Sequence, residues 1–327
     1  MCPLGINCAP ILLLGFNRAD AMAAQIDAIR AIKPSKLYVA VDGPRADRPD
    51  EAEKCQSVRD CVKLVDWPCE VKTLFREKNL GCKHGVSGAI TWFFDNEEAG
   101  IILEDDCRPA VDFLRFASEM LERYKDDERI GAICGFNFFN LQSDKAASYH
   151  FSSHMDVWGW ASWRRVWREY DVEMAFCKGK ENVVIDKSSF SPYQKRLYKR
   201  YVVDLENGLS SWAIPLTLLF LAKGWLTVVP KVRLVANKGV DDTRATHTGG
   251  YVYWGKDWSK AGSIEFPLVH PKEFVCDDAA DRLRERIEGA IFPRGLTWIG
   301  AKVPCLCGLM TFIGRIAEKI APVLFRL

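Results

Sequence analysis

Short apolar runs alternate with amphipathic stretches along the first 135 residues of the chain. Runs bounded by Gly, Pro or Asp predict buried strands, and apolar residues three or four positions apart predict helices. The predicted strands span 10–16, 37–41, 71–75 and 101–103; the predicted helices run from a cap at Asn17 or Asp20 to about Lys33, from Gly81 to about Asp95, and through Phe113, Phe116, Met120 and Leu121. Strands that alternate with helices form βαβ units. The pattern therefore predicts an α/β fold with a doubly wound, mainly parallel sheet and flanking helices.

A further apolar stretch, 212–229, is interrupted by Pro215, Lys223 and Gly224. It predicts a buried helix, a glycine turn and a strand, because a membrane-spanning helix needs about 18 or more consecutive apolar residues. The amino terminus has a short apolar stretch with no basic region ahead of it, so we expect no secretory signal.

Composition sets limits on the function classes. Apolar residues make up 48% and charged residues 27%, as in ordinary soluble globular proteins. The formal net charge of +2 gives no support for a nucleic-acid partner. The 12 cysteines contain no Cys-x-x-Cys pair, and several lie in apolar runs. Free thiols in a cytoplasmic protein are therefore expected rather than a disulfide framework.

Three consecutive acids, Glu104, Asp105 and Asp106, directly follow the predicted strand 101–103. In open α/β sheets the ligand crevice lies at the carboxyl ends of the strands. Adjacent carboxylates repel one another, and burying an unpaired charge is costly, so we expect a cation to meet them. A hard divalent ion that carries phosphate oxygens fits this chemistry. The alternative is a solvated acidic turn that caps the next helix.

The loop after the first predicted strand reads Phe16-Asn17-Arg18. It is neither the G-x-G-x-x-G turn of dinucleotide-binding proteins nor a Walker lysine loop. This argues against a dinucleotide dehydrogenase and against a P-loop NTPase. Phosphate binding would then depend on a metal and on side chains, which returns attention to the acids.

Aromatic residues become dense after Tyr149, with Trp158 and Trp160 flanking a glycine and Trp163 and Trp167 close behind. Such rings can face a sugar or a nucleobase. For most of these aromatic residues we favour the other interpretation, that they pack in the hydrophobic core and form one wall of it. The basic stretch 193–201 is interpreted as a solvated helix face.

Six motifs in order resemble one family. The chain is similar to GT-A-fold bacterial glycosyltransferases of the hemolytic-protein-like group, which are distantly similar to N-acetylglucosaminyltransferase I. The resemblance covers about residues 10 to 250, and its motifs are Gly15-Phe16-Asn17-Arg18, Val41-Asp42-Gly43-Pro44-Arg45, Arg76-Glu77-Lys78-Asn79-Leu80-Gly81-Cys82, Ile101-Ile102-Leu103-Glu104-Asp105-Asp106-Cys107-Arg108-Pro109, Val157-Trp158-Gly159-Trp160-Ala161-Ser162-Trp163 and Ala245-Thr246-His247-Thr248.

The resemblance implies roles for the acids and for two residues near them. Asp106 would ligate Mn²⁺ or Mg²⁺ bridging a diphosphate, Asp105 would bind the ribose or assist the metal, and Glu104 would face the donor sugar. Asp42 would lie at the nucleobase, with Arg18 near the base or the diphosphate.

The resemblance also implies roles outside the acids. Asn79 and Gly81 would line the nucleotide, and Trp158 and Trp160 would lie under the donor sugar and the acceptor mouth. His247 is a candidate second metal ligand, although a lone histidine more often only satisfies a hydrogen bond.

The chain departs from its relatives at Ala213, where they carry the Asp that is the presumed catalytic base. The base would then be a neighbouring carboxylate, with Asp204, Glu206 and Asp156 as candidates. Alternatively, the reaction is retaining and needs no such base, or the protein has lost transferase activity and kept its binding cleft. We favour a relocated base and inverting chemistry.

The sequence divides into a GT-A-like domain over 1–250, with a nucleotide-binding half over 1–135 and an acceptor half over 136–250, and a carboxyl-terminal extension over 251–327. Within 290–327, apolar residues at near-helical spacing alternate with Arg315, Lys319 and Arg326. A basic amphipathic segment can lie on an anionic membrane surface. Packing on the domain or on a partner is the alternative.

The expected activity is metal-dependent transfer of a hexose-like sugar from a nucleotide-diphosphate donor, with a UDP-sugar favoured. The acceptor would be a glycan or a lipid-linked glycan of polysaccharide biosynthesis. We expect a cytoplasmic protein, peripheral on the inner face of the cell membrane through its carboxyl-terminal segment. The alternatives are a catalytically impaired nucleotide-sugar or carbohydrate-binding protein and a nucleotidyltransferase, which would need a Gly-rich loop near the first strand.

Overall fold

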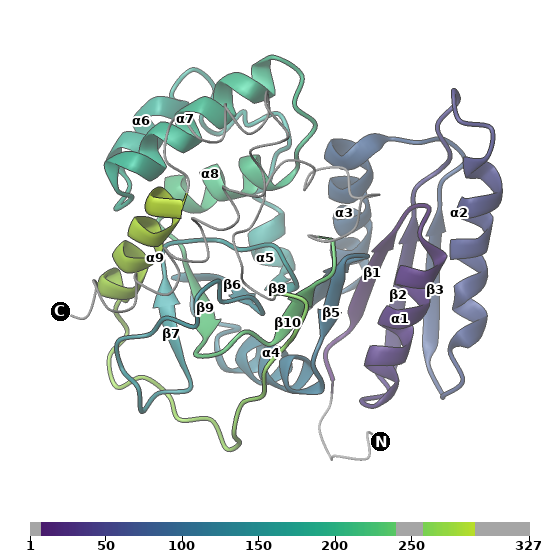
Figure 1. The fold of residues 1–327 in the computed structure, drawn as a ribbon, viewed down its shortest axis with the longest axis horizontal. Coiled ribbons are helices and arrows are strands. Elements are labelled where there is room, and N and C mark those ends of the chain that lie inside the picture. Colours follow the sequence, from purple (N-terminus) through teal and green to yellow (C-terminus); the bar gives the residue numbers. More distant parts are fainter. Residues whose placement is uncertain (1–7, 240–257, 292–327) are drawn as a thin grey trace, which may run out of the picture.

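A computed structural model describes residues 8–239 and 258–291 of the chain, with side chains up to residue 288. Figure 1 shows a twisted sheet with helices on both faces and a helical group at one end. The strands are β1 (Ile11–Gly15), β2 (Lys36–Val41), β3 (Glu70–Phe75), β4 (Ala99–Glu104), β5 (Cys107–Pro109), β6 (Ile130–Cys134), β7 (Tyr149–Ser152), β8 (Trp160–Trp163), β9 (Leu226–Pro230) and β10 (Val235–Asn237).

The α-helices lie between and after these strands. They are α1 (Ala19–Arg30), α2 (Glu51–Asp60), α3 (Ser87–Asn96), α4 (Val111–Arg123), α5 (Arg164–Trp167), α6 (Glu181–Lys187), α7 (Pro192–Glu206), α8 (Ala213–Lys223) and α9 (Asp278–Ile291), with a 3₁₀ turn η1 (Cys61–Leu64) and a π turn η2 (Cys82–Val86). None of the helices in the described part of the chain is both long and apolar enough to cross a membrane.

Eight strands form one sheet in the order β3-β2-β1-β4-β8-β6-β9-β7. Strands β3, β2, β1 and β4 are parallel, and β8 and β7 run antiparallel to their neighbours. The remaining strands, β5 and β10, pair as a short antiparallel ribbon. The predicted α/β class with a mainly parallel sheet and flanking helices is confirmed.

The strand order reverses beside β1. From β1 the chain proceeds to β2 and β3 on one side, and then returns to place β4 on the other side. Because such crossovers are right-handed, the helices of the two directions cover opposite faces of the sheet. A reversal of this kind leaves a crevice at the carboxyl ends of the two central strands. A ligand site is therefore expected at the loops after β1 and β4.

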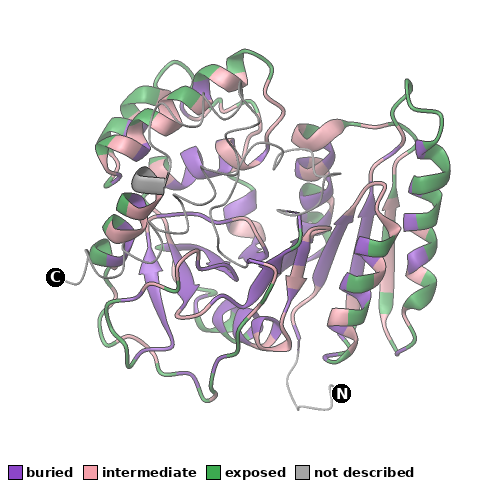
Figure 2. Ribbon diagram, in the orientation of Figure 1, coloured by how far each residue is buried: buried purple, intermediate pink, exposed green. Residues whose placement is uncertain are grey.

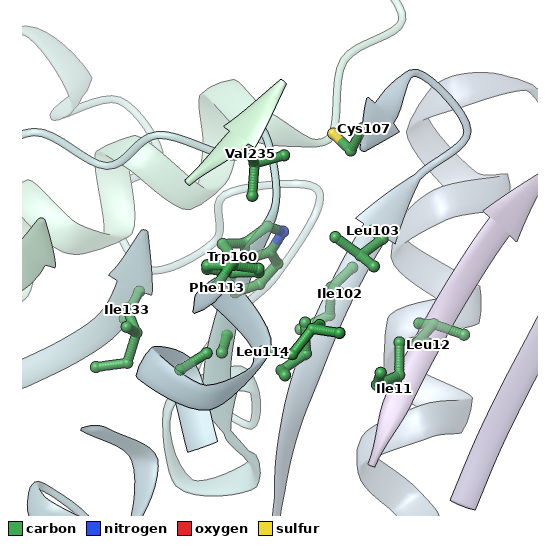
Figure 3. Packing of buried hydrophobic residues seen from close by; sticks show 14 of the residues in the cluster. Ile11, Leu12, Ile102, Leu103, Cys107, Phe113, Leu114, Ile133, Trp160 and Val235 are labelled. Atoms are coloured by element: carbon green, nitrogen blue, oxygen red, sulfur yellow. The ribbon is translucent and has the colours of Figure 1, made fainter. Parts of the chain in front are cut away.

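The burial of each of these strands follows from its place in the sheet. Strand β1 is apolar and almost wholly buried, as are β4 and most of β2, because helices cover both faces of a parallel sheet. Strand β3 lies at one edge of the sheet and stays partly exposed (Figure 2). The core continues under β5 and β10, where Trp160 packs in one cluster with Ile102, Phe113 and Val235 (Figure 3).

The pattern located the first four strands and the helices α1, α3, α4 and α8. It was wrong about the cap of α1, since neither Asn17 nor Asp20 caps it; Arg18 occupies the cap position, and Asp20 lies in the first turn. Helix α8 ends at Gly224 with φ of +67°, followed by β9, as the glycine turn predicted. The pattern missed α2, whose sequence is too polar to show a period.

The aromatic and basic segments are distributed as expected. Trp160, Trp163 and Trp167 are buried in the core, which confirms the interpretation of most of these aromatic residues as a core wall. The basic stretch lies on α7, with its side chains mostly half-buried or exposed. Part of the predicted carboxyl-terminal extension returns to the sheet. There the backbone of Cys276 forms an isolated parallel β-bridge with Phe151 of β7.

Candidate functional site

The residues predicted from the first and fourth strands meet where the strand order reverses. Arg18 follows β1, and Asp105 follows β4. The Arg18 Nε donates to Asp105 Oδ2 at 2.9 Å, and its Nη2 donates to Asp105 Oδ1. Both side chains are largely buried, with 12% and 15% of their surface exposed. A bidentate pair of this kind fixes both groups in orientation as well as in charge.

The other two acids are less well compensated. Burial and the charges of Asp106 and Asp105 raise the pKa of Glu104 from its usual 4.5 to about 8, against opposing effects of Trp212 and Arg18. Burial and the charge of Asp105 also raise the pKa of Asp106. Ionisation of these half-buried acids is therefore costly, and a cationic group placed beside them would be strongly favoured.

Asp106 is held from the far side by the ribbon of β5 and β10. The Asn237 Nδ2 lies 3.4 Å from Asp106 Oδ2, and the Lys238 N–H donates to the Asp106 carbonyl at 2.8 Å. A Cβ atom at Gly239 would come within 2.8 Å of Asp106 Oδ2, so a glycine lets the chain pass close to the acid. Sequence reasoning missed Asn237 and Gly239, because no local signal announces the pairing of β5 with β10.

Trp212 forms a side-chain hydrogen bond with Glu104. Its ring stacks on Trp160 with centroids 5.9 Å apart, and its carbonyl accepts a hydrogen bond of 2.9 Å from the Tyr170 hydroxyl. Hydrogen bonding from Trp212 favours the ionised form of Glu104. The Trp160 Nε1 is buried and has no hydrogen-bond partner among the described residues. Ala213 comes directly after Trp212 at the start of α8, so the position at which the resemblance implies a carboxylate is adjacent to this group.

The predicted nucleotide-lining residues form the neighbouring loop. Asp42, at the end of β2, accepts backbone N–H bonds from Gly43 at 3.0 Å, Leu80 at 3.1 Å and Gly81 at 3.2 Å. Asn79 Nδ2 donates to the Gly43 carbonyl at 2.9 Å, and Gly81 has φ of +72°, which glycine adopts readily. Burial raises the pKa of Asp42 despite these bonds. Asp42 and Asn79 therefore join the loops that follow β2 and β3.

A buried acid that sequence reasoning missed ties the loops after β1 and β2 together. Glu51, the first residue of α2, is only 3% exposed. It accepts from the Arg45 Nε at 3.0 Å and from the Asn17 Nδ2 at 3.3 Å. Without a prediction of α2, nothing in the sequence marked Glu51 as a buried acid.

An aromatic wall, formed by Phe136, Phe138, Trp158 and Trp258, lies at the same edge of the sheet. Strand β6 ends there, and β8, which runs antiparallel, begins there with Trp158 two residues ahead of it. Trp158 packs 4.8 Å from Phe136, 5.2 Å from Phe138 and 5.6 Å from Trp258 between ring centroids. The Trp258 carbonyl accepts a hydrogen bond of 2.9 Å from the Asn237 N–H, which joins the wall to the acids.

The three carboxylates predicted as the catalytic base are found in an ion pair with Arg284 or on the surface of α7. Both carboxylate oxygens of Asp156 accept from Arg284, at 2.7 and 2.8 Å, and Asp156 is only 8% exposed. Asp204 lies 3.7 Å from Arg200 on the surface of α7. Glu206 is exposed at the last turn of α7. Among the described residues, none of the three forms a hydrogen bond or an ion pair with Glu104 or Asp106.

The metal prediction rests on few ligands. In the part of the chain that the structure describes, no group of three or more His, Cys, Asp and Glu side chains could hold a metal ion. His247 and the carboxyl-terminal segment 292–327 lie outside the described residues. Mg²⁺ commonly binds through one or two carboxylates and takes its other ligands from phosphates and water. Asp106 with Glu104 nearby therefore suits a divalent ion whose coordination a substrate completes.

Replacing Glu104 with Gln should stabilise the metal-free protein at alkaline pH. Because the folded-state pKa of Glu104 is raised, the wild type loses stability as pH increases from about 4.5 to about 8. We expect the melting temperature of Glu104→Gln to exceed that of the wild type by roughly 5 °C at pH 8 with EDTA, and by little at pH 5. Thermal melts across this range check it, with Glu122→Gln on the surface of α4 as the control. An equal gain at both pH values would contradict the raised pKa of Glu104.

Comparisons with known proteins give weak likenesses. No protein-family model and no curated protein matches the chain. Residues 1–349 of TarS from S. aureus are 10% identical over 71% of this chain and 61% of that one, with a TM-score of 0.38. HddC from Yersinia pseudotuberculosis is 12% identical over 50% and 80% of the two chains, with a TM-score of 0.30. UDP-glucose pyrophosphorylase complexed with UDP-glucose is 8% identical over 68% and 90%, with a TM-score of 0.33. At such TM-scores none of these likenesses establishes a common fold, so the functional conclusion has to rest on the site.

Proposed function

We propose that the protein transfers a sugar from a nucleotide-diphosphate donor to a glycan or lipid-linked glycan acceptor, with a divalent metal ion as cofactor. The observation that carries the proposal is the pair of half-buried acids with raised pKa values, Glu104 and Asp106, at the reversal of strand order between β1 and β4. Crevices at such a position are the usual ligand sites of open α/β sheets. Five of the six motifs that resemble GT-A glycosyltransferases lie at strand ends on this edge of the sheet, and the sixth, 245–248, lies outside the described residues.

Asp106 would hold Mn²⁺ or Mg²⁺, with Glu104 on the side of the donor sugar. The ion would stabilise the negative charge that develops on the departing diphosphate. Asp105 is paired with Arg18, so we assign it the nucleoside side rather than the metal. Asp42, Asn79 and Gly81 would shape the loop against which the base lies. The contacts of Asp42 and Asn79 within that loop support a role in its shape.

Inverting transfer also needs a base on the acceptor hydroxyl. Of the three carboxylates proposed for it, Asp156 is held in an ion pair by Arg284, whereas Asp204 and Glu206 lie on the last turns of α7, ahead of Trp212. The latter two stay the better candidates for a base that reaches the acceptor. A UDP-sugar is the favoured donor.

A second candidate function is nucleotide-sugar binding without transfer. It is favoured by Ala213, which stands beside Trp212 where relatives carry the presumed base. Release of nucleoside diphosphate that depends on both donor and acceptor would support the transferase. Tight donor binding with no turnover on any acceptor would support the binding protein.

Thermal-shift screening of the wild type against UDP, GDP, CDP, TDP and their sugars, with Mn²⁺ or with EDTA, tests the proposal. We expect one nucleotide series to raise the melting temperature only when Mn²⁺ is present. A ligand at 100 times its Kd adds about 2.7 kcal/mol to the free energy of unfolding, so the shift should be several degrees. No shift with any nucleotide would leave the acids as a structural turn and remove the proposal.

A further inference from the structure

The face of α9 that contacts the rest of the protein is charged. Asp281 accepts from the Ser152 Oγ at 2.6 Å, and Glu285 accepts from the His154 Nε2 at 3.1 Å. Both acids are buried, at 7% and 4% exposure. Arg284 lies between them in sequence and is likewise turned inward. Figure 1 shows α9 beside β7, at the end of the sheet away from α2.

Of the three residues Asp281, Arg284 and Glu285, Arg284 contacts both the loop after β6 and the loop before β8, which carry residues of the aromatic wall. Its guanidinium donates two hydrogen bonds to Asp156, in the loop before β8. Its Cζ also lies 4.5 Å from the centroid of the Phe138 ring, in the loop after β6. The side chain is 16% exposed. One residue of α9 thus holds the two loops at a fixed separation.

From these loops a continuous set of contacts leads to the acids. Phe138 packs against Trp158 and Trp258, with ring centroids 5.2 and 5.4 Å apart. The Trp258 carbonyl accepts from the Asn237 N–H at 2.9 Å. The Asn237 Nδ2 in turn lies 3.4 Å from Asp106 Oδ2. A shift of Phe138 would therefore be passed through packed rings to the strand that positions Asp106.

We propose that Arg284 is a positioning residue for the site: through Asp156 and Phe138 it holds the aromatic wall, and with it Asn237, in place beside Asp106. The task suits arginine, because a planar guanidinium can bind a carboxylate with two parallel bonds and also stack on a ring, whereas an ammonium cannot. That Arg284 holds the aromatic wall and Asn237 in place does not depend on the proposed function; this is the structural half of the inference. The consequence for ligand binding rests on the proposed function.

Amide hydrogen exchange of the segment 232–239 tests the structural half. In Arg284→Met we expect this segment to exchange about 10-fold faster than in the wild type, because local opening no longer has to break the contacts of Arg284 with Asp156 and Phe138. The control is Glu285→Gln, which weakens the docking of α9 but has no contact with the aromatic wall. Faster exchange in Arg284→Met alone supports the inference. Unchanged exchange, or an equal increase in both variants, overturns it.

Calorimetric titration of UDP with Mn²⁺ tests the consequence for binding. Supporting residues around a metal ligand typically contribute 10–100-fold in affinity, so Arg284→Met should bind roughly 10-fold more weakly. Glu285→Gln should bind like the wild type. Equal affinities in all three proteins would overturn the functional half. If the wild type itself binds no UDP, the proposed use of UDP fails, while the exchange measurement still decides the positioning.

Arg284→Lys guards against a variant that does not fold. It retains a positive charge next to Asp156 and Glu288 but lacks the planar fork that also covers Phe138. We expect its exchange over 232–239 to be faster than in the wild type, although less so than in Arg284→Met. Wild-type exchange and wild-type UDP affinity in this variant would show that charge alone suffices, and would overturn the assignment to the guanidinium.

Discussion

Replacing Asp106 with Asn should abolish the metal-dependent part of nucleotide binding. The carboxylate supplies the negative charge that a hard cation requires, and Asn removes that charge with little change of shape. Even residues that only support a metal ligand contribute about 10–100-fold, so the loss in nucleotide affinity with Mn²⁺ should exceed about 100-fold. Calorimetric titration of the nucleotide found by screening, with Mn²⁺ and with EDTA, measures the effect.

Asp105→Asn is the matched comparison, because it removes the same charge one residue away. Asp105 is paired with Arg18, so its loss should weaken binding of the nucleotide yet leave the requirement for Mn²⁺. Asp126→Asn, at an exposed acid beyond α4, controls for net charge. Retention of metal dependence in Asp106→Asn, or its loss in Asp105→Asn, would show that a different carboxylate holds the ion.

The buried pair of Asp156 and Arg284 should dominate the response of stability to mutation. Removing Arg284 leaves the Asp156 carboxylate without its partner at 8% exposure. Breaking a buried pair in this way costs roughly 3–5 kcal/mol, whereas replacing both partners by uncharged residues is often nearly neutral. We therefore expect Arg284→Met to lose about 3–5 kcal/mol and the double variant with Asp156→Leu to recover most of it. Urea denaturation measures both.

Arg282→Met, on the exposed side of α9, is the control and should change the free energy of unfolding by less than about 0.5 kcal/mol. If Arg284→Met were as stable as the wild type, the ion pair would be unimportant for folding. Asp156 would then again be open to a role as the base. Recovery in the double variant, together with nucleotide binding like that of the wild type, would instead mark the carboxylate as structural.

Local patterns were enough to place one side of the site. The apolar runs of β1 and β4 are bounded by Gly and by acids, so the sequence predicted that Arg18 and Asp105 would both lie at the carboxyl ends of parallel strands. Their bidentate pairing could not be predicted, because it depends on β1 and β4 being neighbours in the sheet. That adjacency is a consequence of strand order, which hydrophobic periodicity does not contain.

The other side of the site depends on contacts between distant parts of the chain. Asn237 reaches Asp106 only because β10 pairs with β5, and Trp258 reaches Asn237 only across a backbone hydrogen bond. Glu51 was missed for a different reason: α2 has few apolar residues, so its helical period is hidden. The interpretation of Ala213 as a departure from the motif stays a prediction. The surroundings of Asp156 became visible only with α9 in place.

The charged inner face of α9 has a consequence for how the end of the chain assembles. Apolar packing is non-directional, so a helix held by it can shift along its axis at modest cost. Asp281, Glu285 and Glu288 each meet a specific donor, on Ser152, His154 and Gln194. A slip of one turn would leave several charges desolvated and without partners. The helix therefore has a single register, and it can dock only after β7, the loop that follows β7, and α7 have formed, because these carry the three donors.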